Sequence, residues 1–459
     1  MLQMSRSWYE KGIFFSENTY GGHAAIHNYF LIFAFSPFTF LFGAKGFFIG
    51  WTALLGSLVV LSFQALRTNI RTLLLFLCFI LGPYSFWLFD DPVFGFHLEL
   101  CYAPLALLLF FALENSSKKL TILSTIALIL VREEGAMVAA CVFLAQWSFS
   151  KFVLKIPLPI KSLAFKLGGF FLVFIASLAW LKLMSMVSPA HPAHASKRVL
   201  DGINNLLQSF SDPYFRGLYF RMLKYSLALP IVCMPILFRA KIAFKLIAIW
   251  TLLSIPFIAI NYIAAGSYFP SVYEFGLTWP YRAAPQMGLF WGLLLLSLKH
   301  IPTRSFSKPA FGASLIVLFS IQMYLLKLDR GYDGVKHMAP MFFSSEWQSA
   351  KLTTDELKMV QCFSSNLPPR SPIATSGAFF ALFEESDLVW PNREQYASAK
   401  PLGYLCHEML EGKQISPCFK SKEIAKEEKL NLSIGELQLI TNKQNGLIEI
   451  WQQCFQQGF

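Results

Sequence analysis

The chain has 459 residues, of which 55% are hydrophobic and 14% are charged, and its mean hydropathy is +0.49. Soluble domains carry about 25% charged residues, so this composition excludes an ordinary water-soluble globule. The 47 Phe, 11 Trp and 16 Tyr residues exclude a disordered chain. Several apolar stretches of about 17–25 residues are long enough to cross a bilayer as helices. The sequence therefore predicts an α-helical polytopic membrane protein.

The charge is unevenly distributed along the chain. Residues 1–328 carry a net charge of +15 and residues 329–459 carry −3, within a total of +12. Basic residues commonly flank membrane spans on the cytoplasmic side, so the excess indicates contact with membrane lipids and predicts no nucleic-acid partner. We expect three parts: an external N-terminal segment (1–44), a transmembrane helical bundle (45–328) and a small α+β extracytoplasmic C-terminal domain (329–459).

Apolar length predicts about ten membrane segments, at residues 46–66, 72–89, 98–114, 119–131, 135–149, 162–187, 222–238, 242–261, 282–298 and 310–327. The loops of one face are basic, with Arg67, Arg71, Lys118, Lys119, Lys151, Lys155, Lys161, Lys166, Arg239, Lys241, Lys245, Lys299, Arg304 and Lys308. The positive-inside rule makes this face cytoplasmic. The opposite face, with long loops near 188–221 and 262–281, and the C-terminal domain are then expected outside.

The N-terminal segment contains an apolar stretch, residues 28–42, that is interrupted by Pro37. A stretch of this length is more often interfacial than spanning, and its aromatic side chains suit the headgroup boundary. We expect a helix that lies in the outer leaflet. Because an external N-terminus without a leading span is unusual, we also expect that a first span precedes Met1 in the complete protein.

Two short apolar arms, residues 119–131 and 135–149, flank the polar turn Arg132–Glu133–Glu134. Arms of 13–15 residues rise only about 20–23 Å as helices. The turn is therefore expected below the outer surface, beside a hydrated cavity. Ionisable groups at such depth are costly and tend to mark function.

The C-terminal part shows mixed patterning. An amphipathic helix is predicted over 353–366, and short strands over 371–375, 388–390, 437–441 and 447–451, the last two joined in a hairpin. Cysteines within or beside the spans (Cys78, Cys101, Cys141 and Cys233) are interpreted as small apolar residues. The four others (Cys362, Cys406, Cys418 and Cys454) could form up to two disulfides in an oxidising compartment.

The strongest candidate site lies in the loop after the second predicted span. Asp90, Asp91, His97 and Glu99 fall within ten residues. Oxygen and nitrogen ligands of this kind could hold a divalent cation such as Mg²⁺ or Mn²⁺, and a carboxylate there could act as a general base. The alternative is a solvated loop in which the carboxylates cap the next helix.

Three further groups could contribute chemistry. His23 and His27 have the i, i+4 spacing of one helical face, but without a carboxylate between them the signal is weak, and the start of an interfacial helix is the favoured explanation. Arg132 could contact a phosphate, with Glu133 and Glu134 as partners or ligands, or the three could form a structural ion pair. Tyr281 and Arg282 could bind a sugar and a phosphate, or belong to an interfacial aromatic belt.

The order of these motifs resembles a known family. Gly22-His23, His27-Asn28-Tyr29-Phe30, Pro37, Phe94-Gly95-Phe96-His97-Leu98-Glu99 and Arg132-Glu133-Glu134-Gly135 occur in turn. This pattern is similar to that of the bacterial membrane family called domain of unknown function 2079, which typically has H-F-S-P, F-D-F-H-x-E and K-E-D at these places. The match covers most of residues 15–145, and residues 366–392 resemble the external segment of the family.

More distantly, the layout resembles the GT-C glycosyltransferases, which are multispan enzymes that use polyprenyl-phosphate sugar donors on the outer side of the membrane. In those enzymes an external loop after the first span carries a catalytic Asp or Glu, and a helix lying on the membrane follows. The resemblance implies that the 28–42 helix is of this kind and that the acidic loop precedes Met1 or ends at Glu10 or Glu17. It also places Asp90 and Asp91 where some members bind a metal.

The resemblance implies a multi-pass enzyme of the bacterial cytoplasmic (inner) membrane, acting in the cell envelope. It would transfer a sugar from a polyprenyl-phosphate donor to an acceptor that the sequence does not identify. The expected roles are catalytic for Asp90, Asp91, Glu99, Glu133 and Glu134, substrate-binding for His23, His27, Arg132, Tyr281 and Arg282, and metal-binding for Asp90, Asp91, His97 and Glu99. The alternative is a non-catalytic transporter or scaffold that binds a lipid-linked glycan.

Overall fold

The structure, a computed structural model, describes residues 4, 16–17, 21–22, 27–43, 45–67, 69–86, 97–187, 197–266, 280–302, 308–330, 353–368, 371–375, 387–389, 402–407, 429–435, 437–442 and 446–456. The chain divides into two compact units. The first is formed by Ala24–Asp91 and Phe96–Met338. The second is formed by Leu2–His23, Pro92–Gly95 and Ala339–Phe459, and it includes the two-stranded pair β1 (Ser16–Glu17) and β2 (Gly21–Gly22).

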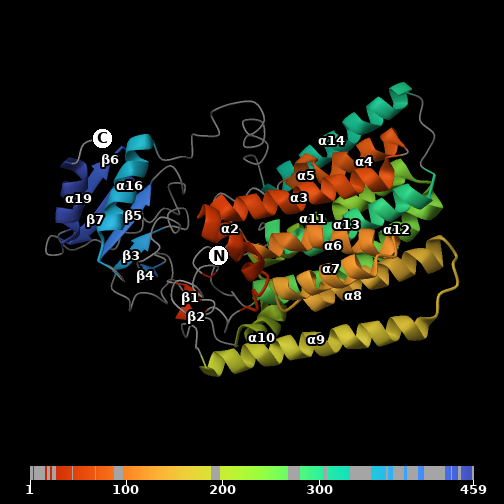
Figure 1. The fold of residues 1–459 in the computed structure, drawn as a ribbon, viewed down its shortest axis with the longest axis horizontal. Helices are drawn as coiled ribbons and strands as arrows, with labels where there is room; N and C mark the ends of the chain where they lie inside the picture. The colour runs from red at the N-terminus through yellow and green to blue at the C-terminus, as the bar shows by residue number, and fades with distance from the viewer. Residues whose placement is uncertain are drawn as a thin grey trace. The chain divides into compact units, whose positions relative to one another are not determined.

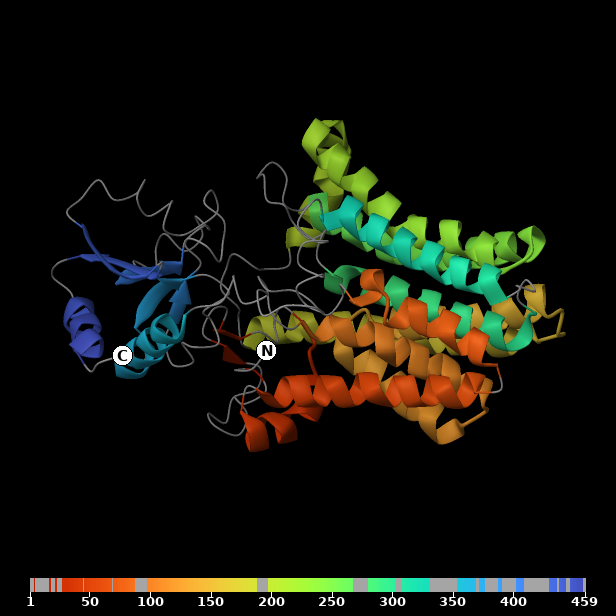
Figure 2. The same ribbon diagram turned by 90° about the horizontal axis from the view of Figure 1, so that it is seen from above.

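The first unit is a bundle of helices whose long members lie side by side (Figures 1 and 2). Its elements are α2 (Ile32–Phe42), α3 (Lys45–Leu66), α4 (Ile70–Ile80), α5 (Pro83–Phe86), η3 (Leu98–Cys101), α6 (Tyr102–Glu114), α7 (Lys118–Val131), α8 (Gly135–Ser148), the π-helical turn η4 (Phe149–Val153), α9 (Ile160–Val187), α10 (Lys197–Ser211), α11 (Pro213–Leu237), α12 (Ala240–Gly266), α13 (Pro280–His300) and α14 (Lys308–Arg330). The expectation of a mostly helical chain is confirmed.

Among the described residues, five helices are long and apolar enough to cross a membrane: Lys45–Leu66, Gly135–Val153, Ile160–Met184, Ala240–Gly266 and Lys308–Leu325. Three shorter apolar helical stretches accompany them, at Ile32–Phe42, Ile70–Ser85 and Leu227–Leu237. By the length and apolar composition of these helices, the chain is a multi-pass membrane protein. The expectation of about ten spans stays a prediction.

The sequence-based expectation of a long loop at 188–221 is wrong for its second half. Residues 197–211 form α10, and α11 already begins at Pro213. Asp212 caps α11, because its side chain accepts hydrogen bonds from the backbone N–H groups of Tyr214 and Phe215. Pro213 occupies the first turn, where its missing N–H is not needed.

Close packing of α6 against α13 forms the centre of the bundle. Gly288 and Gly292 lie one turn apart on α13, and both face α6. A Cβ atom at Gly288 would lie 2.8 Å from the Cβ of Ala106, and one at Gly292 would meet the ring of Phe110. Small residues at this spacing let two membrane helices approach closely, so these glycines set the distance between α6 and α13.

The second unit contains a five-stranded sheet with the strand order β4-β3-β5-β7-β6. Its strands are β3 (Pro372–Thr375), β4 (Asp387–Val389), β5 (Gly403–His407), β6 (Lys429–Ile434) and β7 (Leu437–Asn442). β3 pairs in parallel with β4 and β5, whereas β7 pairs antiparallel with β5 and β6. The expectation of a small sheet near the C-terminus is thus confirmed.

Two helices, α16 (Thr354–Asn366) and α19 (Leu447–Gln456), pack on one face of this sheet (Figure 2). Phe363 of α16 and Trp451 of α19 contact each other edge to face, with ring centroids 5.5 Å apart, above Leu405 and Leu439 of the strands. The predicted strand at 447–451 is therefore wrong. Its apolar residues recur with helical spacing, and β7 forms its hairpin with β6 instead.

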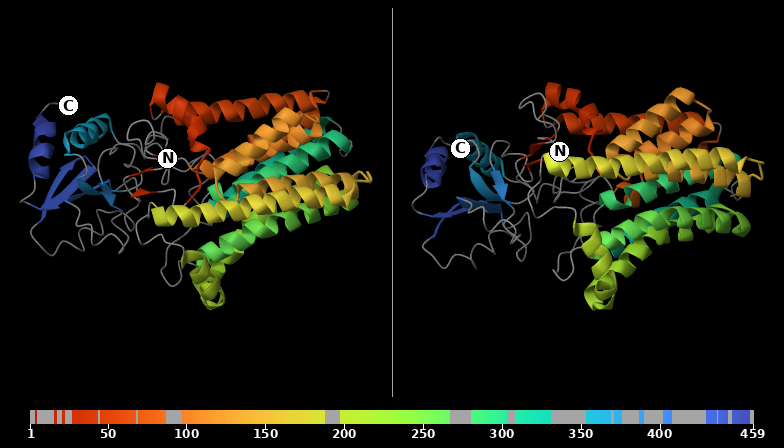
Figure 3. Two further views of the ribbon diagram at one scale, coloured as in Figure 1. Left: turned by 60° about the horizontal axis from the view of Figure 1, so that its bottom comes forward. Right: turned by 90° about the horizontal axis from the view of Figure 1, so that it is seen from below.

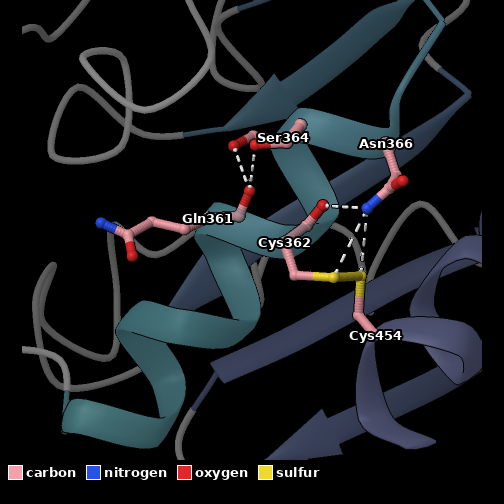
Figure 4. Close-up of a disulfide and its surroundings, with 6 residues drawn as sticks. Gln361, Cys362, Ser364, Asn366 and Cys454 are labelled. Atoms are coloured by element: carbon pink, nitrogen blue, oxygen red, sulfur yellow. Dashed lines mark hydrogen bonds between the residues drawn. A yellow bond between two sulfur atoms is a disulfide. The ribbon is translucent and has the colours of Figure 1, made fainter. Parts of the chain in front are cut away.

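A disulfide between Cys362 and Cys454 joins α16 to α19 (Figure 4). The side-chain amide of Asn366 donates to the carbonyl oxygen of Cys362 at 2.9 Å and lies beside both sulfur atoms. One of the two possible bridges is therefore present. The side chain of Cys406 and the whole of Cys418 lie outside the described residues. The cysteines of the bundle (Cys78, Cys101, Cys141 and Cys233) are free thiols.

Candidate functional site

Several helix ends meet at one end of the bundle and bring together residues that are distant in sequence. η3 leads into α6, the turn 132–134 joins α7 to α8, α12 ends at Gly266 and α13 begins at Pro280. The segment before α2 also reaches this end, because the backbone N–H of Leu31 donates to the carbonyl oxygen of Leu130 at 2.6 Å. Charged side chains on these elements form one cluster.

Arg132 lies at the centre of the cluster and contacts three carboxylates. Its Nη1 donates to Oε1 of Glu99 at 3.0 Å, and its Nε lies 2.9 Å from Oε1 of Glu133 and 3.3 Å from Oε2 of Glu134. All four side chains are largely removed from solvent, with exposed fractions of 15% for Arg132 and 3% for Glu99. A cation shared by several buried carboxylates satisfies the requirement that buried charges be paired.

The turn that carries Arg132 depends on a glycine. Gly135 begins α8, and a Cβ atom there would collide with the carbonyl oxygen of Leu128 on α7. Only glycine allows the two helices to approach so closely. The adjacent residues Glu133 and Glu134 are therefore held in a tight connection, in which both carboxylates can reach the same guanidinium.

The segment before α2 closes one side of the cluster. The hydroxyl of Tyr29 donates to Oε1 of Glu99 at 2.7 Å, and Nδ1 of His27 lies 3.0 Å from Oε1 of Glu133. Asn28 donates from its side chain to the carbonyl oxygen of Ser177 on α9 at 3.0 Å. Residues 27–29 thus connect the N-terminal segment to η3, to the turn and to α9.

The two neighbouring carboxylates of the turn have different pKa values. Burial would raise the pKa of Glu133, but the charges of Arg132 and His27 outweigh it and hold that pKa well below its usual range. Burial raises the pKa of Glu134 to about 7, and the neighbouring carboxylates of Glu133 and Glu99 act in the same direction against Arg132. Glu134 can therefore take up or release a proton near neutral pH.

A pocket lies next to the cluster and contains about 360 Å³ of space not filled by atoms, part of it open to solvent. It is lined by Glu99, Arg132, Glu134, Phe257, Ile260, Asn261, Arg282 and Pro285. Arg282, at the start of α13, donates from Nη1 to Oδ1 of Asn261 at 3.3 Å. A carboxyl that titrates near pH 7 and a second guanidinium therefore line the same pocket, beside apolar side chains of α12.

A second charged cluster lies at the opposite end of α6. Glu114 contacts Nζ of Lys299 at 3.1 Å and Nε2 of His300 at 2.6 Å, and Gln146 donates to its other oxygen at 3.4 Å. Glu99 and Glu114 are separated by about 22 Å along the helix. The two clusters are thus independent, and the second provides a comparison for experiments on the first.

The structure brings together all seven predicted site residues whose side chains it describes: His27, His97, Glu99, Arg132, Glu133, Glu134 and Arg282. Asp90, Asp91, His23 and the side chain of Tyr281 lie outside the described residues. The sequence did not single out Tyr29 or Asn261. The signal for Asn261 was available, because a polar amide in an otherwise apolar span tends to mark function.

The proposed metal set is described only in part. His97 Nδ1 lies 3.9 Å from Oε2 of Glu99, while Oε1 of Glu99 is already bonded to Tyr29 and Arg132. Within the part of the chain that the structure describes, no group of three His, Cys, Asp or Glu side chains is placed to hold a metal ion. The described members alone do not fit Mg²⁺ or Mn²⁺, and the chemistry derived below does not depend on a metal.

The fold and the cluster define a class: a multi-pass helical membrane protein with a charged pocket at one end of its bundle and a small α/β unit near its C-terminus. Comparisons with protein-family models, with curated proteins and with solved structures find no match to this chain.

Proposed function

We propose that the protein is a membrane glycosyltransferase of GT-C type, which transfers a sugar from a polyprenyl-phosphate donor to an acceptor hydroxyl on the outer face of the membrane. One observation carries the proposal. Glu134, with a pKa of about 7, and the guanidinium of Arg282 line the same pocket of an otherwise apolar bundle. Sugar transfer from a lipid phosphate needs both a base for the acceptor and a cation for the leaving phosphate.

In the proposed reaction the acceptor oxygen attacks the anomeric carbon, a new C–O bond forms, and the bond between that carbon and the phosphate oxygen breaks. Glu134 takes the proton from the acceptor hydroxyl. General bases work best with a pKa near the operating pH, and they contribute about 10²–10⁴-fold in rate. The electron pair of the broken bond stays on the polyprenyl phosphate, which leaves as an anion.

Arg282 is assigned to the departing phosphate, because a guanidinium presents a planar fork that matches phosphate oxygens. Its Nη1 donates to Asn261, an uncharged amide, and its side chain lines the pocket together with Glu134. Arg132, in contrast, is surrounded by Glu99, Glu133 and Glu134. We therefore assign Arg132 the role of positioning these carboxylates.

The membrane setting supports a lipid-linked donor. The pocket is bounded by Phe257, Ile260 and Pro285 as well as by charges, so a substrate with a charged head and an apolar chain fits its lining. The basic loops at the other end of the helices favour an outward-facing pocket in the bacterial inner membrane. The C-terminal unit would then be extracytoplasmic and would contact the acceptor or a protein partner.

The test uses the full chain reconstituted in phospholipid vesicles, with undecaprenyl phosphates that carry radiolabelled mannose, glucose, galactose or arabinose as probes. Water serves as the acceptor hydroxyl in this assay, so the measurement is the appearance of free undecaprenyl phosphate and the release of the labelled sugar from the lipid fraction. We expect Glu134→Gln to lower turnover by about 10²–10⁴-fold and Arg282→Gln by about 10²–10³-fold.

Glu114→Gln is the matched control, because it removes a partly buried and ion-paired carboxylate at the far end of α6. It should leave turnover within about threefold of the parent, because Glu114 lies about 22 Å from Glu99 along the helix. Equal activity of the Glu134 variant and the parent would contradict the mechanism. Saturable binding of a probe without turnover would favour the alternative, a non-catalytic carrier or scaffold.

A further inference from the structure

Helix α10 has an exposed apolar surface that neither the bundle nor the pocket uses. At 3.6 residues per turn, successive side chains are separated by about 100° around the helix axis. This spacing divides the described side chains of α10 into three sectors: one buried, one exposed and apolar, and one exposed and polar.

The buried sector holds α10 against the ends of two other helices. A Cβ atom at Gly202 would collide with the carbonyl oxygen of Ile263 on α12, so this contact requires glycine. On the same side, Ser209 is fully buried, and its hydroxyl lies 2.7 Å from that of Tyr219 on α11. These contacts fix the rotation of α10 about its axis.

The exposed apolar sector consists of Ile203, Leu207 and Phe210, whose exposed fractions are 51%, 86% and 40%. They fall within about 60° of one another around the helix. The polar sector beside it contains only exposed polar side chains, namely Asp201, Asn204, Gln208 and Ser211. A helix with these two adjacent exposed faces has the pattern of one that lies at a membrane surface.

The position of α10 in the bundle agrees with such a surface. Its contacts with Ile263 and Gly266 lie in the last turn of α12, where that spanning helix ends. Both views in Figure 3 show the yellow-green α10 lying crosswise at the end of the green helices. Phe220 and Leu223 of α11, the next helix in the chain, are also exposed apolar side chains.

We propose that α10 lies in the plane of the membrane surface, at the end of the bundle that carries the charged cluster, with Ile203, Leu207 and Phe210 among phospholipid acyl chains. The occupant of the apolar sector is lipid, because α10 packs against the last turn of the spanning helix α12 and presents an exposed apolar face beside an exposed polar one. Asn204 and Gln208 then face the headgroups and water. The inference concerns the placement of the helix and does not depend on the proposed sugar transfer.

The test places the photoreactive residue p-benzoylphenylalanine at Leu207 or at Asn204 in the full chain. Both positions are exposed, so neither substitution disturbs a packed contact. The proteins are reconstituted in vesicles of phosphatidylethanolamine and phosphatidylglycerol with radiolabelled oleoyl chains and are then irradiated. We expect at least about fivefold more lipid label on the protein from position 207 than from position 204.

Equal labelling from the two positions would overturn the proposal. Crosslinking from position 207 to a second copy of the chain, in place of lipid, would also overturn it and would assign the sector to an interface between copies. The same photoreactive residue at Ile203 repeats the test at a second position of the apolar sector, and it should behave as position 207 does.

Discussion

Removal of the central guanidinium of the charged cluster tests how far the cluster stabilises the bundle. The substitution Arg132→Met keeps a long side chain but leaves Glu99, Glu133 and Glu134 without their shared cation. Removing one partner of a buried ion pair costs about 3–5 kcal/mol, since the remaining charge is buried without compensation. Glu99 is only 3% exposed, so it cannot recover this loss through contact with water. We expect a loss in the upper part of this range at pH 7.

The free energy of unfolding can be measured on the full chain in mixed dodecylmaltoside and sodium dodecyl sulfate micelles, with tryptophan fluorescence as the signal. Lys299→Met is the matched control, since it removes a cation from Glu114 at the other end of α6. The Lys299 side chain is 30% exposed and Glu114 keeps its contact with His300, so this loss should be about 1 kcal/mol or less. If the two variants lose the same stability, the electrostatic argument is refuted.

A double substitution separates the lost interaction from other effects of the methionine. Glu99→Gln removes one of the carboxylate charges that lose their cation in Arg132→Met. It keeps the size of the side chain and its ability to form hydrogen bonds. The double variant with Arg132→Met should therefore lose less stability than the sum of the two single variants. Residues in one ion-pair network show coupling of about 0.5–3 kcal/mol. Additive losses would show that Arg132 and Glu99 do not stabilise each other.

Two further predictions concern proton binding and helix packing. Because the pKa of Glu134 is raised from 4.5 to about 7, the folded protein binds this proton more tightly than the unfolded chain does. The resulting stability is fully present below pH 4.5 and is lost as the pH rises through 7; unfolding measured from pH 5 to 8 should show this loss in the parent and not in Glu134→Gln. Gly292→Val should lower the unfolding free energy by about 1–3 kcal/mol, because the side chain overpacks against Phe110. Gly312→Val on α14, where a Cβ atom meets nothing within 4 Å, should change it by less than about 0.5 kcal/mol, and equal losses would disprove the packing explanation.

Long apolar runs could be located from sequence because a spanning helix needs a continuous apolar segment. The run 46–66 corresponds to α3 (Lys45–Leu66) almost residue for residue. α10 was missed by the same criterion, since half of its surface is polar and it forms no apolar run. Its pattern of Ile203, Leu206, Leu207 and Phe210 has helical spacing, so a search for periodicity would have detected it.

The error at residues 447–451 has a similar cause. A short run rich in β-branched and aromatic residues suggested a strand, but Leu447, Ile450, Trp451 and Cys454 recur at i, i+3, i+4 and i+7. That spacing places them on one face of a helix, and the buried contacts of α19 use this face. The residues that follow the run, up to Cys454, distinguish the helical period from the strand period.

The candidate site was predictable only where its residues are adjacent in sequence. Arg132, Glu133 and Glu134 stand next to one another, so the sequence already groups their charges, whereas their depth in the membrane stays a prediction. The contact between Arg132 and Glu99 joins positions 33 residues apart, and that between His27 and Glu133 joins positions 106 apart. Such pairings depend on the packing of helices, which one sequence does not specify.

The location of the cluster follows from the cost of burying charge in an apolar bundle. Ionisable side chains are most costly at the centre of a span, and at the end of a helix the backbone itself supplies compensation. Glu134 is the N-terminal flanking residue of α8, and Glu99 lies in the short turn that leads into α6. The positive ends of helix dipoles favour carboxylates at such positions. Arg132 offsets part of the remaining negative charge through its contacts with the three carboxylates, and Glu134 and Arg282 line the pocket beside it. The proposed proton acceptor and the proposed phosphate-binding cation can lie in one pocket because the helix ends and Arg132 together stabilise the carboxylates beside them.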